Sequence, residues 1–377
     1  MQRFTLIDSG QVLNASEALT FPVRRRKYLS GTLQMQRSEK ALDQNEVHQR
    51  WLNNEPILLP GAVSSQLAAV AADIETSKAL YEGVLDGQEL DELLSGGNYP
   101  QQLAPEFELL SARYDAADEQ EICSIDFDAH ADGELIEDIW LRAAWLSYDE
   151  RDASLRFRFS FGMEGYEDVS QDLQRQQLAA ELEERIFPES RILSHNESLH
   201  DLLGQIIQCE NYQLLERIVY YNAPNGGAQF HHDAEKGHVG VVYAQLSGKT
   251  FWLALSKAQL IAEIQAFVQN TENCNSLLAE VKQKNLDESF VTKLGNGNFI
   301  DQALNELFHP ELELLLNFNK AFFAQLVKQG YGYYLQAGDI ILLPQESMAN
   351  CAWHTVFCVG ESAGQALSFA IKTFDQF

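Results

Sequence analysis

The sequence has few cysteines, no long apolar run and no recognisable leader. Its five cysteines are scattered, odd in number and without a Cys-x-x-Cys pair, which favours reduced thiols over a disulfide framework. No apolar stretch approaches the roughly 20 residues that a bilayer span needs. The first residues, MQRFTLIDSGQVL, lack the basic and apolar regions of a secretory signal peptide. We therefore expect a cytoplasmic protein without a membrane partner.

Positive charge is also scarce. The 377 residues include 27 Lys and Arg against 55 Asp and Glu, a net charge of −28. Because such a chain repels phosphate backbones, nucleic acid is not expected as a partner. Solubility explains the acidity in the first instance, and a basic peptide or protein substrate is the alternative. The oligomeric state cannot be read from these features.

The first part of the chain mixes strand and helix patterns. Residues 1–60 contain short strand-like pieces and turns, and residues 64–84 combine a serine cap with helix-forming residues. A loop rich in glycine and proline follows and ends near Pro105. We expect residues 1–105 to form an N-terminal α+β region that packs on the core.

Strand patterns dominate from residue 106 onward. The segments 138–148 and 153–163 alternate apolar and polar residues, which predicts an antiparallel hairpin with one buried face. Helices are expected at 164–187, at SLHDLLGQIIQ, and in an insert at about 257–330. Residues 106–377 are therefore expected to be mainly β with α, forming a double-stranded β-helix of the jelly-roll or cupin type that carries a helical insert.

Two histidines and an aspartate stand where an apolar strand pattern begins. In an extended chain, residues two apart share a face, so His231 and Asp233 point to the same side. A third ligand is expected from His354, which opens the strand-like segment HTVFCV after AGDIILLP. Two His and one Asp form the facial triad of non-haem Fe(II) oxygenases, with positions left open for cosubstrate and O₂.

The ordered motifs FHHD, AQLSGKTFWLAL, LQAGDIILLP and WHTV resemble those of the JmjC/cupin-like Fe(II)- and 2-oxoglutarate-dependent oxygenases. The resemblance covers about residues 214–371, and the helical insert is unmatched. It implies that His231, Asp233 and His354 hold Fe(II). It also implies that 2-oxoglutarate and O₂ are cosubstrates in the hydroxylation of a protein side chain or a small molecule.

The resemblance places the lysine that binds the far carboxylate of 2-oxoglutarate on Lys249. Counted along an unbroken strand, Lys249 shares a face with Asp233. Lys372 is the rival, because many related oxygenases use a basic residue on the strand after the distal histidine. Additional hydroxyl contacts to the cosubstrate are expected from Tyr220, Tyr243 or Tyr221, although tyrosines on barrel strands more often belong to the core.

Other polar residues have simpler interpretations. His130 and Asp132 form a second His-x-Asp pair, but no Gly-Asp…Pro…His pattern follows closely, so an acidic surface loop is expected. His238 follows a turn-like segment, which indicates solvent exposure or a substrate contact. The hairpin arginines are expected on its solvated side or, alternatively, at an anionic substrate: Arg142, Arg156 and Arg158.

Two alternative functions stay open. A metal-dependent cupin enzyme, either an isomerase or a dioxygenase, would use the same metal ligands without 2-oxoglutarate. The orientation of Lys249 discriminates between this cupin enzyme and the 2-oxoglutarate-dependent oxygenase, because a lysine turned away from the metal favours the cupin enzyme. A non-catalytic, metal-stabilised binding module for a basic partner ranks last, since a structural site would be coordinatively closed.

Overall fold

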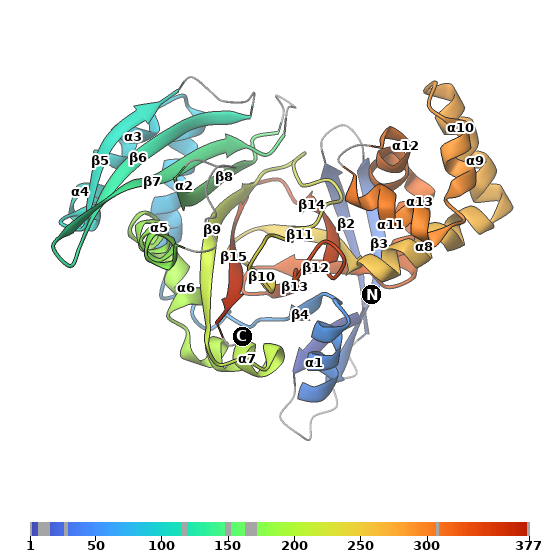
Figure 1. Ribbon diagram of the computed structural model, residues 1–377, viewed down its shortest axis with the longest axis horizontal. Coiled ribbons are helices and arrows are strands. Elements are labelled where there is room, and N and C mark those ends of the chain that lie inside the picture. The colour runs from blue at the N-terminus through green and yellow to red at the C-terminus, as the bar shows by residue number, and fades with distance from the viewer. Residues whose placement is uncertain are drawn as a thin grey trace.

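The computed structural model describes residues 2–6, 16–25, 29–114, 120–147, 152–162, 172–306 and 309–374. Within these residues the strands form two sheets that lie beside one another (Figure 1). Apolar side chains of both sheets join one buried cluster, so the sheets pack face to face. No helix of the described part is long and apolar enough to cross a membrane.

The smaller sheet combines N-terminal and C-terminal strands. Its order is β1 (Gln2–Leu6), β3 (Leu29–Leu42), β2 (Ser16–Arg25), β14 (Ala352–Val359), β11 (Lys249–Ser256) and β12 (Gly332–Gln336). All pairs are antiparallel except β1 with β3. Strands β14 and β11 pair along their whole length, so β14 is held firmly at the centre of the sheet.

The larger sheet is antiparallel throughout. Its order is β4 (Ile57–Leu59), β13 (Ile340–Pro344), β10 (Gly240–Gln245), β15 (Gly364–Thr373), β9 (Tyr212–Asn222), β8 (Leu155–Phe161), β7 (Glu134–Trp145), β6 (Glu121–Ala131) and β5 (Phe107–Arg113). The chain crosses from this sheet to the smaller one after β10, returns at β13, and crosses again for β14. The mainly antiparallel arrangement confirms the prediction of a β-rich fold.

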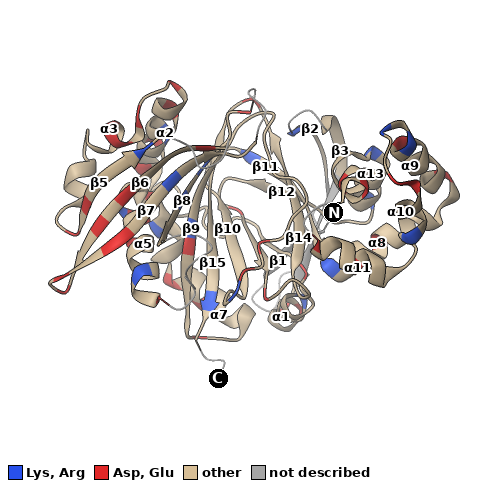
Figure 2. Ribbon diagram, turned by 45° about the horizontal axis from the view of Figure 1, so that its top comes forward, with Lys and Arg blue, Asp and Glu red and all other residues tan. Residues whose placement is uncertain are grey.

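Strands β5 to β8 extend the larger sheet beyond the part that faces the smaller one. The predicted hairpin is β7 and β8, and the aromatic residues Phe157 and Phe159 of β8 pack against Phe187 in the buried core. The opposite face of β8 carries Arg156 and Arg158. Figure 2 shows acidic residues, coloured red, along β6 and β7. The connector after Ser147 lies partly outside the described residues.

Helices cover the outer faces of both sheets. The N-terminal half contributes α1 (Gln44–Leu52), α2 (Ala71–Leu85), α3 (Leu90–Leu94), α4 (Tyr99–Leu103), α5 (Leu173–Ile186), η1 (Pro188–Ser190), α6 (Arg191–Ser194) and α7 (Glu197–Ile207). The insert between β11 and β12 consists of α8 (Lys257–Gln269), α9 (Thr271–Gln283), α10 (Glu288–Lys293), α11 (Gly297–Asn305), α12 (Pro310–Glu313), the π-helix η2 (Leu314–Phe318) and α13 (Lys320–Lys328). A second apolar cluster joins this insert to the outer face of the smaller sheet (Figure 1).

Several local predictions were wrong in their boundaries. The helix expected at 64–84 begins at Ala71, because residues 60–69 form successive turns. The N-terminal residues contain long strands and the unpredicted helix α1. The helix expected at 164–187 is described from Leu173, and residues 163–171 lie outside the described part. Strands β2 and β4 pair with β14 and β13, while an N-terminal region that ends at residue 105 and packs on the core stays a prediction.

Candidate metal centre

A two-residue bridge between distant parts of the chain builds the site. The backbone N–H of His231 donates to the carbonyl of His354 at 3.0 Å, and the N–H of His354 donates back at 2.9 Å. Directly opposed residues of an antiparallel pair point to the same side. The two imidazole centroids accordingly lie 4.2 Å apart. Apart from this bridge, residues 223–239 are irregular, so the strand expected at FHHD does not form.

Asp233 completes a three-ligand cluster. Its carboxylate oxygens lie 3.4 Å from Nε2 of His231 and 3.5 Å from Nε2 of His354. All three donor atoms lie within 4.8 Å of one another, and no other such group of three is found among the described residues. Ligands at about 2.0–2.2 Å from one ion sit about 3 Å apart when adjacent. The donor set and its spacing therefore fit a single divalent ion.

The electrostatics of the cluster hold two of its three residues, Asp233 and His354, in the form that binds a metal. Burial and the neighbouring His231 lower the pKa of His354 to about 3, so this imidazole is neutral. Burial alone would raise the pKa of Asp233, but the two imidazoles outweigh it and hold that pKa below its ordinary value. Burial likewise opposes protonation of His231, yet its bond to Asp233 raises the pKa. An ionised carboxylate and a neutral imidazole are the forms that bind metals.

Neighbouring groups fix the orientation of both imidazoles. Nδ1 of His231 lies 2.7 Å from the carbonyl of Gln229, which leaves Nε2 free to face the ion. The ring of His354 stacks on Trp252, with centroids 5.1 Å apart and planes at 22°. Trp252 is held in turn by a bond of 2.9 Å from its indole N–H to the hydroxyl of Thr250. The ligand geometry is therefore supported by the segment before His231 and by β11 of the smaller sheet.

The helical insert holds the segment that carries His231. The backbone N–H of Phe230 donates to Oδ1 of Asn317, in η2, at 2.8 Å. Arg25, fully buried in β2, donates to the carbonyls of Asn317 at 2.8 Å and of Ala228 at 3.2 Å, and to the hydroxyl of Thr355. These hydrogen bonds connect β2, the insert and β14 to the segment that carries His231.

Replacing Asn317 with alanine is expected to lower both stability and metal affinity. The buried N–H of Phe230 would lose its acceptor, which costs about 1–3 kcal/mol of unfolding free energy. Because the segment next to His231 loosens, affinity for Mn(II) should fall roughly tenfold, as for other groups that orient ligands. Calorimetric titration measures the affinity for Mn(II). Asn319→Ala is the control, because Asn319 caps α13. Asn319→Ala should destabilise the protein without weakening Mn(II) binding. If Asn317→Ala bound Mn(II) as tightly as Asn319→Ala does, Asn317 would have no role in supporting the metal site.

The cluster borders a cavity of about 290 Å³ between the two sheets. Apolar side chains form much of its wall: Leu146, Phe230, Val241, Trp252, Leu343 and Val356. Its polar lining comprises Arg156, Tyr220, Asn222, Gln229, Tyr243 and Ser368, in addition to the three cluster residues. Such a mixture of apolar wall and few polar groups is typical of a small-ligand site.

Two of the predicted tyrosines reach this cavity and the third does not. The hydroxyl of Tyr243 accepts a bond of 3.0 Å from the amide of Asn222 and donates to Gln245 at 3.2 Å. Tyr220 lies beside it, with ring centroids 6.4 Å apart. Tyr221 points the other way and stacks on Tyr81 at 4.4 Å in the core. Tyr220 and Tyr243 are therefore the tyrosines available to a ligand.

Neither predicted lysine lines the cavity. Lys249 is exposed at the first position of β11, and the next residue, Thr250, faces inward to bond Gln245 at 2.9 Å. The parity prediction was wrong because β10 ends at Gln245 and a turn at Gly248, with φ of +68°, precedes β11. Lys372 is buried near Gln176 and Phe374. The lining residue with a positive charge is instead Arg156.

The competing histidines take other places. His130 ends strand β6 and lies 3.8 Å from Glu108, so the expected surface loop is a strand followed by a turn at Asp132. His238 is buried, contrary to the expected exposure. Its burial, with Lys372 and Arg158 nearby, lowers its pKa to about 4. Neither residue lines the cavity beside the cluster.

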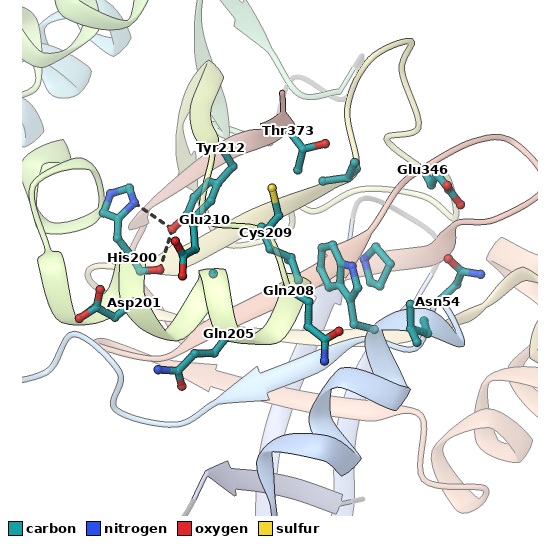
Figure 3. Close-up of a pocket in the computed structure, with 16 residues that line it drawn as sticks. Asn54, His200, Asp201, Gln205, Gln208, Cys209, Glu210, Tyr212, Glu346 and Thr373 are labelled. Carbon is teal, nitrogen blue, oxygen red and sulfur yellow. Dashed lines mark hydrogen bonds between the residues drawn. The ribbon is translucent and has the colours of Figure 1, made fainter. Parts of the chain in front are cut away.

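A larger cavity of about 1150 Å³ lies elsewhere, between α1, α7 and the beginning of β9 (Figure 3). Its histidine, His200, is already engaged, with Nδ1 2.9 Å from the hydroxyl of Tyr212 and Nε2 3.0 Å from the carbonyl of Ser194. It carries carboxylates at Asp201, Glu210 and Glu346, which lie apart from one another in Figure 3. Size alone does not make it the chemical site, because the described metal cluster borders the smaller cavity.

No protein-family model and no curated protein sequence matches this chain. Among solved structures, it is similar to an oxidoreductase of the 2OG-Fe(II) oxygenase family from Burkholderia pseudomallei, with 9% identity over 87% of this chain and 89% of that chain, and a TM-score of 0.31. The ribosomal oxygenase YcfD of Escherichia coli gives 13% identity over 69% of this chain and 41% of that one, with a TM-score of 0.23. YcfD in complex with cobalt and succinic acid gives 12% identity over the same shares and a TM-score of 0.24. Similarity at this level does not assign the chain to a family.

Proposed function

We propose that this protein is a non-haem Fe(II) oxygenase that uses 2-oxoglutarate and O₂ to hydroxylate a protein side chain or a small molecule. The observation that carries the proposal is the cluster of His231, Asp233 and His354, whose donor atoms lie within 4.8 Å at the edge of a cavity. Two imidazoles and one carboxylate are the ligands that non-haem Fe(II) oxygenases use, and they leave coordination positions open. The resemblance of the surrounding motifs supports the same chemistry.

The residues around the cluster have distinct tasks in this proposal. Bound Fe(II) supplies the activation of O₂ and of the 2-oxo acid. His231, Asp233 and His354 hold the ion, while Trp252 keeps His354 in place. The apolar wall of the cavity excludes water from the reacting groups. The hydroxyl groups of Tyr220 and Tyr243 are available to hydrogen-bond and orient the cosubstrate.

The proposal includes a fold and a location. Strands β9 to β15 are divided between the two sheets, and the chain crosses from one sheet to the other four times between β10 and β15, which supports a double-stranded β-helix of the jelly-roll type. The free cysteines support a reducing, cytoplasmic location, as the sequence indicates. The cavity size supports a small ligand or a single inserted side chain.

A metal-dependent cupin enzyme that does not use 2-oxoglutarate is the second candidate. The exposed position of Lys249 favours it, because the lysine that the family resemblance assigns to the cosubstrate lies outside the cavity. A non-catalytic module is supported less well, since three protein ligands leave open positions on the ion.

Anaerobic titration with Fe(II) and then 2-oxoglutarate tests the proposal. We expect one Fe(II) per chain and then a visible charge-transfer absorption band on addition of 2-oxoglutarate, because its keto and carboxylate oxygens would chelate the ion. Folded protein that binds Fe(II) but develops no band would move the assignment to the second candidate. Succinate release under air then allows a screen for substrates.

The Lys249→Ala variant is expected to bind 2-oxoglutarate as tightly as the wild-type protein does. Its side chain is exposed at the start of β11 and does not line the cavity. The charge-transfer titration measures the dissociation constant of each protein. A loss of more than about tenfold would return Lys249 to the role that the family resemblance implies.

A further inference from the structure

Among the described residues that line the metal-side cavity, Arg156 is the one lysine or arginine. It comes from β8, which belongs to the extension of the larger sheet. The neighbouring residues Leu155 and Phe157 are fully buried on the opposite face of β8. Arg156 therefore projects toward the cavity, and its cross-strand partner on β9 is Tyr220, which also lines it.

Within the described residues, no carboxylate pairs with the positive charge of Arg156. No ion pair or side-chain hydrogen bond of Arg156 is found within the described residues, whereas Arg158 lies 3.9 Å from Glu216 and Arg113 lies 3.3 Å from Asp126. The carboxylate that lines the cavity is Asp233, and it is paired with the two imidazoles. A half-buried guanidinium beside an apolar wall is stabilised strongly by an anion that enters the cavity.

Tyr220 lines the cavity together with Arg156 and Asp233. Burial raises the pKa of Tyr220 to about 12; Asp233 adds to this rise and Arg156 opposes it. The hydroxyl thus lies in the fields of both the metal ligand and the guanidinium. A ligand that binds the ion at one end and passes Tyr220 would present its other end to Arg156.

We propose that Arg156 is the anion-binding residue of this cavity and holds the carboxylate of 2-oxoglutarate that is remote from the ion. The inference rests on the proposed function and assigns to the sheet extension a task that the sequence placed on a barrel lysine. Arginine suits it, because its planar guanidinium forms two parallel hydrogen bonds with one carboxylate. The extension then contributes directly to cosubstrate selection.

Comparison of two 2-oxo acids tests the assignment. Both 2-oxoglutarate and pyruvate carry the chelating keto acid, but pyruvate lacks the remote carboxylate. Calorimetric titration of the Mn(II)-loaded protein should show tighter binding of 2-oxoglutarate. In Arg156→Ala, the affinity for 2-oxoglutarate should fall roughly 10- to 100-fold, as for loss of a hydrogen bond to a charged group. Its affinity for pyruvate should stay the same, so the preference disappears, and Arg156→Lys should recover part of it.

Arg158→Ala is the matched control. Arg158 lies two residues further along the same strand, on the same face, and outside the cavity lining. It should keep the wild-type preference, and thermal unfolding curves verify that each variant is folded. An unchanged preference in folded Arg156→Ala would overturn the assignment and leave the proposed function standing. Wild-type protein that binds Mn(II) but neither acid would overturn the use of 2-oxoglutarate, and the assignment with it.

Discussion

The Asp233→Ala variant is expected to lose at least roughly 100-fold in affinity for divalent metal, and with it all Fe(II)-dependent activity. Asp233 contributes the negative charge of the cluster and lies within 3.5 Å of both imidazoles. Without it, two imidazoles remain to bind the ion. Calorimetric titration of the apoprotein with Mn(II) measures the loss of metal affinity.

The second His-x-Asp pair of the chain offers the control. Asp132 stands two residues after His130, as Asp233 stands two residues after His231, but it lies in a turn after β6. Asp132→Ala should bind Mn(II) like the wild-type protein. If Asp132→Ala lost the metal and Asp233→Ala kept it, the assigned centre would be wrong.

The Gly227→Ala variant is expected to disrupt the site without changing a ligand. Gly227 has φ of +129°, and a Cβ there would lie 2.2 Å from the carbonyl oxygen of Val356 in β14. The segment must move away from β14, and the bridge between His231 and His354 lies at its end. We expect unfolding free energy to fall by at least about 3 kcal/mol and metal affinity to fall more than tenfold, as for other changes near ligands. Urea denaturation and Mn(II) titration measure the two effects.

Gly360→Ala separates backbone strain from the steric clash. Gly360 has φ of +104°, yet a Cβ there would meet no atom within 4 Å. This variant should lose about 1–3 kcal/mol and keep its metal affinity. Equal stability of the two variants, each with wild-type metal affinity, would show that the close approach of Gly227 to β14 is not required.

The local pattern of the sequence was sufficient to single out the three residues that the structure brings together. His231 and Asp233 are two residues apart, and His354 lies at a strand in a recognisable motif, so pattern and order located all three. The structure brings their donor atoms together. The residues meet for a different reason from the one expected. A short backbone bridge, rather than a continuous strand, aligns His231 with His354.

The position of Lys249 shows where counting along the chain fails. The period-two rule holds only within one strand, and the turn at Gly248 changes the face that follows. One glycine with a positive φ thus moves Lys249 to the surface and Thr250 to the interior. The sequence pattern does not show where β10 ends, so it cannot predict on which face of the sheet the side chain of Lys249 lies.

Arg156 and Asn317 could not be placed from sequence because their neighbours are distant in the chain. Arg156 reaches the cavity because β8 pairs with β9, and Asn317 reaches Phe230 because the insert packs beside β14. The hairpin pattern did predict which residues of β8 are buried, since Phe157 and Phe159 are inside. The opposite face adjoins the metal-side cavity through Arg156, which agrees with the alternative of an anionic ligand rather than with a purely solvated side of the hairpin.

A crystal structure of the protein soaked with Mn(II), with anomalous diffraction from the metal, tests the shared ion most directly. We predict one strong anomalous peak at about 2.0–2.3 Å from Nε2 of His231, a carboxylate oxygen of Asp233 and Nε2 of His354. A peak at any other cluster of side chains, with these three left uncoordinated, would contradict the assignment.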